Sequence, residues 1–139
     1  MIKLAKKAAE NAFVPYNKHK MGSSILAYDG SMFTGCNVEN SISGLGNCSE
    51  ICAIDNAVSH GKYKFRALCV FDTRGNFSYP CGVCRQYIAQ FIQVVQEDIK
   101  IIVACSKGHE VVNFKEIFPK GYYNSTNLED IKEYADRNK

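Results

Sequence analysis

Cysteines stand at the start of two segments that have the pattern of helices. Cys48 directly precedes residues 49–61, whose apolar positions recur at helical spacing, and Cys81 and Cys84 open a second such segment. Each segment follows a strand or a loop, so the thiols lie where strands give way to helices. This placement limits the chain to folds in which strands and helices alternate.

The rest of the chain supplies the strands of this alternation. A hairpin is predicted from residues 21–30 and 31–40, with its turn at Asp29 and Gly30. The remaining predicted elements are strands at residues 65–72, 98–106 and 110–114 and helices at residues 2–13, 48–61 and 81–93. We therefore expect an α/β fold in which helices cover a mixed sheet of about five strands.

Length and charge exclude several classes of protein. The chain has 139 residues, of which 46% are hydrophobic and 22% charged, which fits a single domain over residues 1–139. The net charge is only +3 and the basic residues are scattered, so we expect no nucleic acid polymer as a partner. No apolar run approaches the roughly 20 residues of a membrane span, and residues 1–13 lack the pattern of a secretory signal. The expected location is cytoplasmic, without membrane contact.

Seven cysteines are many for this length, and their odd number without a secretory signal argues against a disulfide framework. Cys69 and Cys105 lie within apolar runs and are predicted to be core residues, as are Cys36 and Cys52. The cysteines at the two helix starts are therefore the candidates for chemistry.

These thiols favour a catalytic zinc site. The pair Cys81 and Cys84 alone would fit a redox pair, half of a zinc site or chance. With Cys48 there are three thiolates, which leave the fourth tetrahedral position open for water or substrate. Glu50 lies two residues after Cys48, where its carboxylate can reach a water at that position and move protons. A cysteine, a glutamate two residues on and a later P-C-x-x-C, here with Pro80, match the motif of zinc deaminases.

The sequence resembles the small, homotetrameric cytidine deaminases that bind zinc through three cysteines. The resemblance covers most of the chain and includes the segments "FVPYNKHKMGSSILAYDG", "FTGCNVENSISGLGNCSE", "PCGVCRQYIAQF" and "FKEIFPKGY". It implies a three-layer α/β/α fold, one zinc ion per chain and a homotetramer. It also implies hydrolysis of cytidine or 2'-deoxycytidine to uridine or deoxyuridine plus ammonia, a step of pyrimidine salvage, with Glu50 as the proton shuttle.

The resemblance further implies which residues bind the substrate. Asn37 and Glu39 would hold a ribose hydroxyl, and their alternate positions on a strand place both side chains on one side. The backbone N–H of Ser49 would hold the carbonyl of the base. His19 stands where the family usually carries a phenylalanine that stacks on the pyrimidine. Tyr122 would close the pocket of a neighbouring subunit, with Tyr123 as the second choice.

Some positions depart from the pattern of the family. Ile51 replaces an arginine that commonly follows the glutamate, so helix dipoles, backbone N–H groups or Arg85 would have to offset the charge of the third thiolate. Ser43 replaces a tyrosine, which affects one contact between subunits. Residues 1–123 would form the deaminase core, and residues 124–139 a C-terminal tail that is predicted to be helical.

Three other interpretations stay open. An aminonucleoside deaminase of the blasticidin S type shares the zinc motifs, although the chain lacks the glycine-proline found there before the ligand cysteine. A non-catalytic zinc-binding assembly module would not need Glu50. A redox protein would use Cys81 and Cys84 but not Cys48. The zinc content of the protein and its activity on cytidine, deoxycytidine and blasticidin S distinguish these interpretations.

Overall fold

A five-stranded mixed sheet forms the centre of the molecule in the computed structural model, which describes residues 1–137. The strand order is β2-β1-β3-β4-β5, and only β3 and β4 run parallel, so the predicted α/β sheet is confirmed. The strands are β1 (Met21–Ala27), β2 (Met32–Cys36), β3 (Phe65–Asp72), β4 (Lys100–Cys105) and β5 (Gly108–Asn113).

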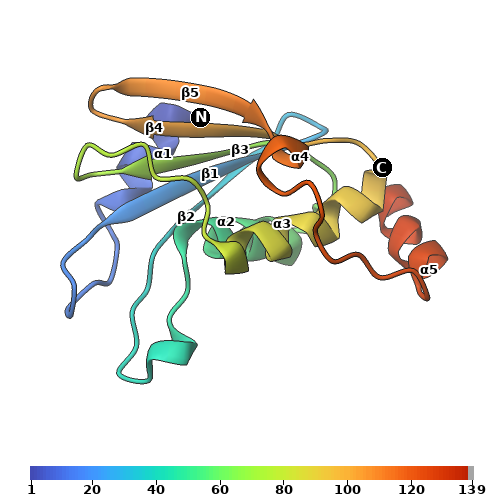
Figure 1. Ribbon diagram of the computed structural model, residues 1–139, viewed down its shortest axis with the longest axis horizontal. Coiled ribbons are helices and arrows are strands. Elements are labelled where there is room, and N and C mark those ends of the chain that lie inside the picture. Colours follow the sequence, from blue (N-terminus) through green and yellow to red (C-terminus); the bar gives the residue numbers. More distant parts are fainter. Residues whose placement is uncertain (138–139) are drawn as a thin grey trace.

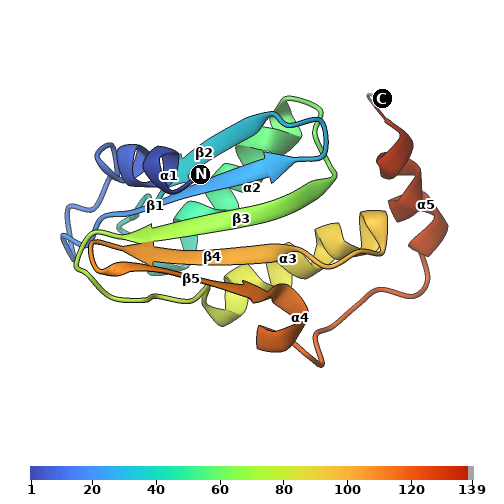
Figure 2. The same ribbon diagram turned by 90° about the horizontal axis from the view of Figure 1, so that it is seen from above.

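Helices cover both faces of the sheet, which gives the expected three layers (Figures 1 and 2). The α1 helix (Ile2–Ala9) packs on one face, called here the α1 face. The helices α2 (Ser49–Ser59) and α3 (Gly82–Val95) pack on the other face, called here the α2 face. The N-terminal ends of α2 and α3 lie side by side beneath the sheet (Figure 1).

Two glycines allow helices to approach the strands closely. A Cβ atom on Gly22 of β1 would lie 1.9 Å from the carbonyl oxygen of Ala5 in α1. A Cβ atom on Gly35 of β2 would lie 2.3 Å from the backbone nitrogen of Ala53 in α2. Glycine is therefore required at one position on each face, and Gly35 sets the distance between the sheet and the helix that carries Glu50.

The alternation of side chains along β3 separates two cores. Leu68 and Val70 point to the α2 face and join the main core with residues of α2, α3 and β4. Cys69 and Phe71 point to the α1 face, where they pack with Ala5 and Ala104 in a smaller cluster. The larger core lies under α2 and α3, so it fixes the two helix starts that carry the three cysteines.

The first helix and the second strand are shorter than predicted. The helix ends at Ala9 instead of residue 13, because Phe13 pairs with Val38 in an isolated bridge. In this bridge the N–H of Phe13 donates to the carbonyl of Asn37 at 3.0 Å, and the N–H of Glu39 donates to the carbonyl of Phe13 at 2.8 Å. The strand predicted over residues 31–40 ends at Cys36. The N–H of Asn37 still donates to the carbonyl of Met21 in β1 at 3.3 Å, but residues 38 and 39 turn away to form this bridge.

The C-terminal part contains short helices that lie beside α3. These are α4 (Phe114–Ile117), α5 (Leu128–Glu133) and a 3-10 turn, η2 (Tyr134–Asp136). Far from them in the sequence, a further 3-10 turn, η1 (Ser43–Leu45), lies between β2 and α2. The tail predicted as helical over residues 124–139 is helical from residue 128 to residue 136, and its last two residues lie outside the described part. Within residues 1–137 none of the helices is long and apolar enough to cross a membrane.

Candidate metal centre and substrate pocket

Three thiols converge where α2 and α3 begin. Cys48 immediately precedes α2, Cys81 immediately precedes α3, and Cys84 lies in the first turn of α3. Their sulfur atoms all lie within 4.8 Å of one another, and the sulfurs of Cys48 and Cys81 are 3.9 Å apart. Zinc–sulfur bonds of about 2.3 Å in tetrahedral geometry separate two sulfurs by about 3.8 Å. The spacing and chemistry of the three thiols therefore fit zinc.

The helix starts also favour the thiolate form that binds metal. Unpaired N–H groups and the positive end of the helix dipole stabilise negative charge there. A hydrogen bond from the Cys84 thiol lowers the pKa of Cys48 to about 7. Donating that hydrogen bond raises the pKa of Cys84, as does its burial. Cys81 is exposed, Cys48 is half-buried and Cys84 is buried, so the cluster extends from the surface to the core.

Glu50 is a buried acid beside these thiols. It lies in the first turn of α2 and is only 5% exposed. Burial raises the pKa of its carboxyl group, although hydrogen bonds from Ser49 and Cys84 partly oppose this effect. The hydroxyl of Ser49 donates to Oε2 of Glu50 at 3.2 Å. A buried carboxyl group with a raised pKa next to a metal site is suited to accept and return protons.

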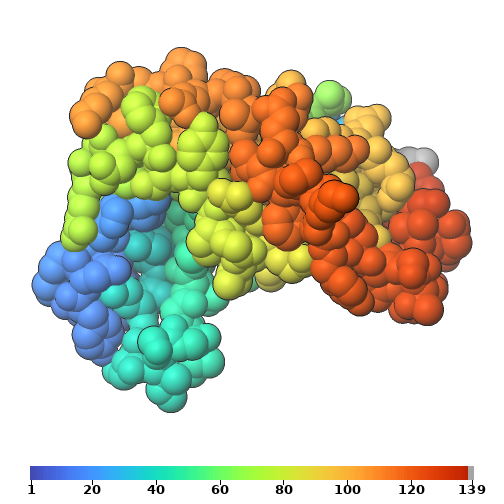
Figure 3. All heavy atoms as spheres, in the orientation of Figure 1, coloured from blue at the N-terminus to red at the C-terminus, as the bar shows by residue number. Residues whose placement is uncertain are grey.

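A pocket extends from Cys48 towards the end of β2. Its volume is about 430 Å³, and Cys48, Asn37 and Glu39 all contribute to its wall. Residues 38–46, which form part of the same wall, project below the sheet in Figure 1, and Figure 3 shows this projection beside the N-terminal segment that contains residue 16. The structure therefore brings Asn37 and Glu39 to one pocket with Cys48, the thiol that precedes α2.

Backbone groups hold the two candidate ribose-binding side chains in place. The carboxylate of Glu39 accepts hydrogen bonds from the N–H groups of Tyr16 at 3.0 Å and Asn17 at 3.2 and 3.3 Å. The side chain of Asn37 accepts from the N–H of Met21 at 2.9 Å and donates to the carbonyl of His19 at 2.8 Å. A carboxylate has about four acceptor positions and an amide has two N–H groups, so both side chains retain capacity for a ligand.

His19 has a partner that the sequence did not suggest. Its Nε2 atom lies 2.7 Å from Oδ1 of Asp72, whose side chain is 1% exposed. Asp72 also accepts hydrogen bonds from the N–H of Arg74 at 2.7 Å and from the hydroxyl of Ser78. The pair thus ties the segment before β1 to the loop that leads to Cys81. The one signal in the sequence that could have pointed to this pair is the acid that ends the mostly apolar strand β3.

The remaining predicted residues, Tyr122, Tyr123 and Arg85, lie along or beside α3. Tyr122 is 75% exposed and contributes, with Gly82 and Val83, to a groove of about 730 Å³ along α3. Tyr123 faces a different cavity, beyond the other end of α3. Arg85 donates to the carbonyl groups of Pro80 at 2.7 Å and Ile117 at 2.6 Å. These contacts direct the guanidinium group of Arg85 to backbone oxygens, among them that of the residue before Cys81.

The other cysteines divide into two groups. Cys69 and Cys105 are buried, as predicted. Cys36 and Cys52 are only half-buried, because they lie where β2 and α2 meet near the surface. Burial raises the pKa of both thiols, which keeps them protonated and unreactive at neutral pH. Within the described residues the three thiols at the helix starts are the one group of cysteine, histidine and acidic side chains with the spacing of a metal site.

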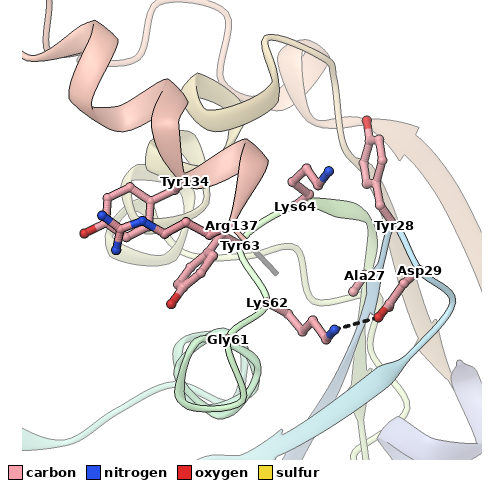
Figure 4. A pocket seen from close by; sticks show the side chains of 9 residues that line it. All are labelled: Ala27, Tyr28, Asp29, Gly61, Lys62, Tyr63, Lys64, Tyr134 and Arg137. Atoms are coloured by element: carbon pink, nitrogen blue, oxygen red, sulfur yellow. Dashed lines mark ion pairs between the residues drawn. The ribbon is translucent and has the colours of Figure 1, made fainter. Parts of the chain in front are cut away.

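A second cavity, of about 250 Å³, lies at the opposite end of the sheet and has a different character (Figure 4). Tyrosine rings and basic side chains form most of its wall, and its one carboxylate, Asp29, is paired with Lys62 at 2.7 Å. Its lining, as far as the structure describes it, contains no cysteine, in contrast to the pocket that begins at Cys48.

The α/β fold and the cluster of three thiols, with buried Glu50 beside it, together indicate a zinc-dependent enzyme. Residues 1–103 match the family described as cytidine and deoxycytidylate deaminase zinc-binding region. The chain is 50% identical over 92 residues to a cytidine deaminase from Sporosarcina psychrophila, which covers 66% of this chain and 67% of that protein. It is 33% identical over 131 residues to a cytidine deaminase from Halalkalibacterium halodurans, covering 94% of this chain and 96% of that protein.

Solved structures agree with these relatives. A crystal structure of cytidine deaminase from Burkholderia pseudomallei superposes with a TM-score of 0.79 at 31% identity, covering 87% of this chain and 95% of that chain. The chain therefore belongs to the zinc-binding cytidine and deoxycytidylate deaminase family, and its zinc-binding region carries the three-cysteine cluster of Cys48, Cys81 and Cys84.

Proposed function

We propose that the chain is a zinc-dependent cytidine deaminase that converts cytidine or 2'-deoxycytidine to uridine or deoxyuridine and ammonia, a step of pyrimidine salvage. The observation that carries this proposal is the cluster of three thiols within 4.8 Å of one another beside buried Glu50. We further propose that residues 1–139 act as a single deaminase domain with one zinc ion, and that the protein works in the cytoplasm.

Glu50 moves the protons of the reaction. Zinc, when bound by the three thiolates, supplies a Lewis acid that lowers the pKa of water. Glu50 accepts a proton from the attacking water and passes it to ring nitrogen 3 while the water oxygen bonds to carbon 4 of the base. Glu50 then delivers the second proton of the water to the amino group, which leaves as ammonia. Its buried position, 5% exposed, protects this exchange from bulk solvent.

The negative charge of a site with three thiolates has to be offset by its surroundings. Three thiolates and Zn²⁺ carry a formal charge of −1, which opposes loss of a proton from water. The positive ends of α2 and α3 both point at this charge and offset part of it. Ile51 is 8% exposed, packs in the core and has no charge, so it cannot offset the charge of the thiolates. Helix starts therefore take over the role that an arginine commonly fills in the family.

Asn37 and Glu39 are proposed to bind the ribose. Both line the pocket that begins at Cys48, and backbone hydrogen bonds fix the orientation of both side chains. The backbone N–H of Ser49 is proposed to hold the base carbonyl, since Ser49 is the first residue of α2. His19, which lies against Asp72, is proposed to stack on the base in place of the phenylalanine of the family.

We propose a homotetramer in which Tyr122 reaches the pocket of a neighbouring subunit. Tyr122 and Val83 are 75% and 68% exposed, and both line the groove along α3. Ile42 and Leu45, on the projecting segment of the pocket wall, are 64% and 61% exposed. Large exposed apolar side chains at these positions would be covered by another copy of the chain.

The test is to measure zinc per chain and then the loss of ultraviolet absorbance with cytidine, deoxycytidine and blasticidin S. One zinc per chain and turnover of cytidine or deoxycytidine, abolished in Glu50→Gln, would support the proposal. Preference for blasticidin S would indicate an aminonucleoside deaminase. A zinc-loaded but inert protein would indicate a binding module, and a metal-free protein with an oxidisable Cys81–Cys84 pair a redox protein.

A further inference from the structure

Two neighbouring serines on β1 are fully buried on opposite faces of the sheet. Ser23 and Ser24 are both 0% exposed. The hydroxyl of Ser23 lies 2.7 Å from the hydroxyl of Ser49 on the α2 face. The hydroxyl of Ser24 donates to the carbonyl of Met1 at 2.9 Å on the α1 face. The same chemical group thus has a partner next to the thiol centre on one face and a partner in the N-terminal segment on the other.

The serine on the α2 face begins a chain of hydrogen bonds that ends on Glu50. The hydroxyl of Ser49 donates to Oε2 of Glu50 at 3.2 Å. A serine hydroxyl has a single proton. Because Ser49 uses its proton on Glu50, the proton between the two serines must come from Ser23. The chain therefore runs from Ser23 through Ser49 to the carboxylate, and each bond polarises the next.

The anchor of this chain is rigid. β1 lies between β2 and β3, and Ser23 pairs with Gly35 on one side and Val70 on the other. Ser49, Glu50 and Ser23 are all buried, so the bonds do not compete with bulk water. Hydrogen bonds through Ser49 thus connect the carboxylate of Glu50 to the central part of the sheet.

We propose that Ser23 is a positioning residue for Glu50: acting through Ser49, it holds the carboxylate in the orientation needed for proton transfer at the zinc site. This inference rests on the proposed deaminase function. Serine suits the task, because Glu50 alternates between carboxylate and carboxylic acid during the reaction. Hydroxyl groups can donate or accept, so rotation of both hydroxyls keeps the chain intact in either state.

The test compares Ser23→Ala with the matched variant Ser24→Ala. Ser23→Ala is expected to lower kcat for cytidine about threefold to tenfold, with little change in KM and with one zinc retained per chain. Ser24→Ala removes an equally buried hydroxyl from the adjacent position, so it is expected to lower the melting temperature without changing kcat. Equal kcat values for the two variants, or loss of zinc from Ser23→Ala, would overturn the proposal.

Ser49→Ala provides a second test, which can overturn the proposal even if Ser23→Ala does not fold. It removes the bond to the carboxylate directly but keeps the backbone N–H, so kcat should fall about tenfold. The double variant Ser23→Ala/Ser49→Ala should be no slower than Ser49→Ala alone, because both serines act on one oxygen. An unchanged kcat in Ser49→Ala, or additive losses in the double variant, would contradict the chain. An inactive wild type would instead refute the proposed function itself.

Discussion

On the α2 face of the sheet, Ser23 and Gly35 lie under the helix that carries Glu50, whereas on the α1 face Gly22 and Ser24 lie under Ile2–Ala9. Each face uses a glycine to let a helix approach and a buried serine to bond to the segment above it. On the α2 face these contacts place a carboxylate beside three thiols, and on the α1 face they attach a helix without such groups. Similar packing thus orients the candidate catalytic groups on the α2 face, whereas on the α1 face it holds α1 against the sheet.

Removal of the metal should have the largest effect on turnover and on stability. Because the thiols lie at the starts of α2 and α3, this effect should arise on the α2 face. A chelator is expected to abolish turnover and to lower the melting temperature, because the thiolates then lose the ion that joins α2 to α3. At a free zinc concentration about 100 times the Kd, this linkage is worth about 2.7 kcal/mol. Calorimetry with and without zinc measures it. Persistent turnover in metal-free protein, or failure of added zinc to restore it, would contradict the account.

Glu50→Gln should be the next largest change. The amide has nearly the same shape but cannot shuttle protons, so kcat should fall by about 10³-fold to 10⁴-fold while zinc stays bound. Steady-state kinetics with metal analysis measures both quantities. Glu129→Gln, on exposed α5, serves as the matched control and should leave kcat unchanged. A kcat of Glu50→Gln within tenfold of the wild-type value would show that Glu50 is not the proton shuttle.

The two glycines permit a direct comparison of the faces. Gly22→Ala and Gly35→Ala should each destabilise the fold by about 1–3 kcal/mol, because a Cβ atom would collide with helix backbone. Only Gly35→Ala should also lower kcat, since it moves the helix that carries Glu50. Urea denaturation and kinetics on both variants measure this difference. An equal loss of kcat in both would show that the faces are not functionally distinct.

The smallest expected effect concerns Asp72. Burial alone would raise the pKa of its carboxyl group, but hydrogen bonds from Ser78, His19 and the backbone of Arg74 lower it overall. The folded state therefore binds this proton less readily than the unfolded state, whose pKa is about 3.9. The resulting stabilisation is present above about pH 4 and is lost as the pH falls through the folded-state pKa.

Urea denaturation of metal-free protein against pH measures this contribution. Asp72→Asn should be less stable than wild type at neutral pH, and the difference should narrow as the pH falls below about 4. Asp130→Asn, on exposed α5, is the control and should track wild type. A difference for Asp72→Asn that stays constant down to acidic pH would show that its role does not depend on charge.

The sequence predicted the alternation of strands and helices and the positions of the thiols, because both depend on local patterns. Apolar periodicity located residues 65–72 as a strand, and the spacing of Cys81 and Cys84 at a helix start indicated a metal site. The end of the first helix was missed, because the bridge between Phe13 and Val38 is a contact between distant segments. Local propensity cannot reveal such a contact.

The partners of Ser23 and His19 were missed for the same reason. Two serines in the middle of an apolar strand were a visible signal, but their bonds to Ser49 and Met1 depend on which helix covers each face. The pairing of His19 with Asp72 joins the segment before β1 to the end of β3, which the fold brings together from distant parts of the sequence. Sequence patterns therefore located the reacting groups, whereas the residues that orient them required the tertiary structure.

X-ray absorption at the zinc edge of the purified, reduced protein tests the central claim most directly. We expect three sulfur ligands at about 2.3 Å and one oxygen ligand at about 2.0 Å, which leaves one corner for the reacting water. Loss of one sulfur in Cys48→Ala would assign the ligand from α2. Four sulfur ligands, or four protein side chains with no solvent position, would contradict an open zinc site beside Glu50.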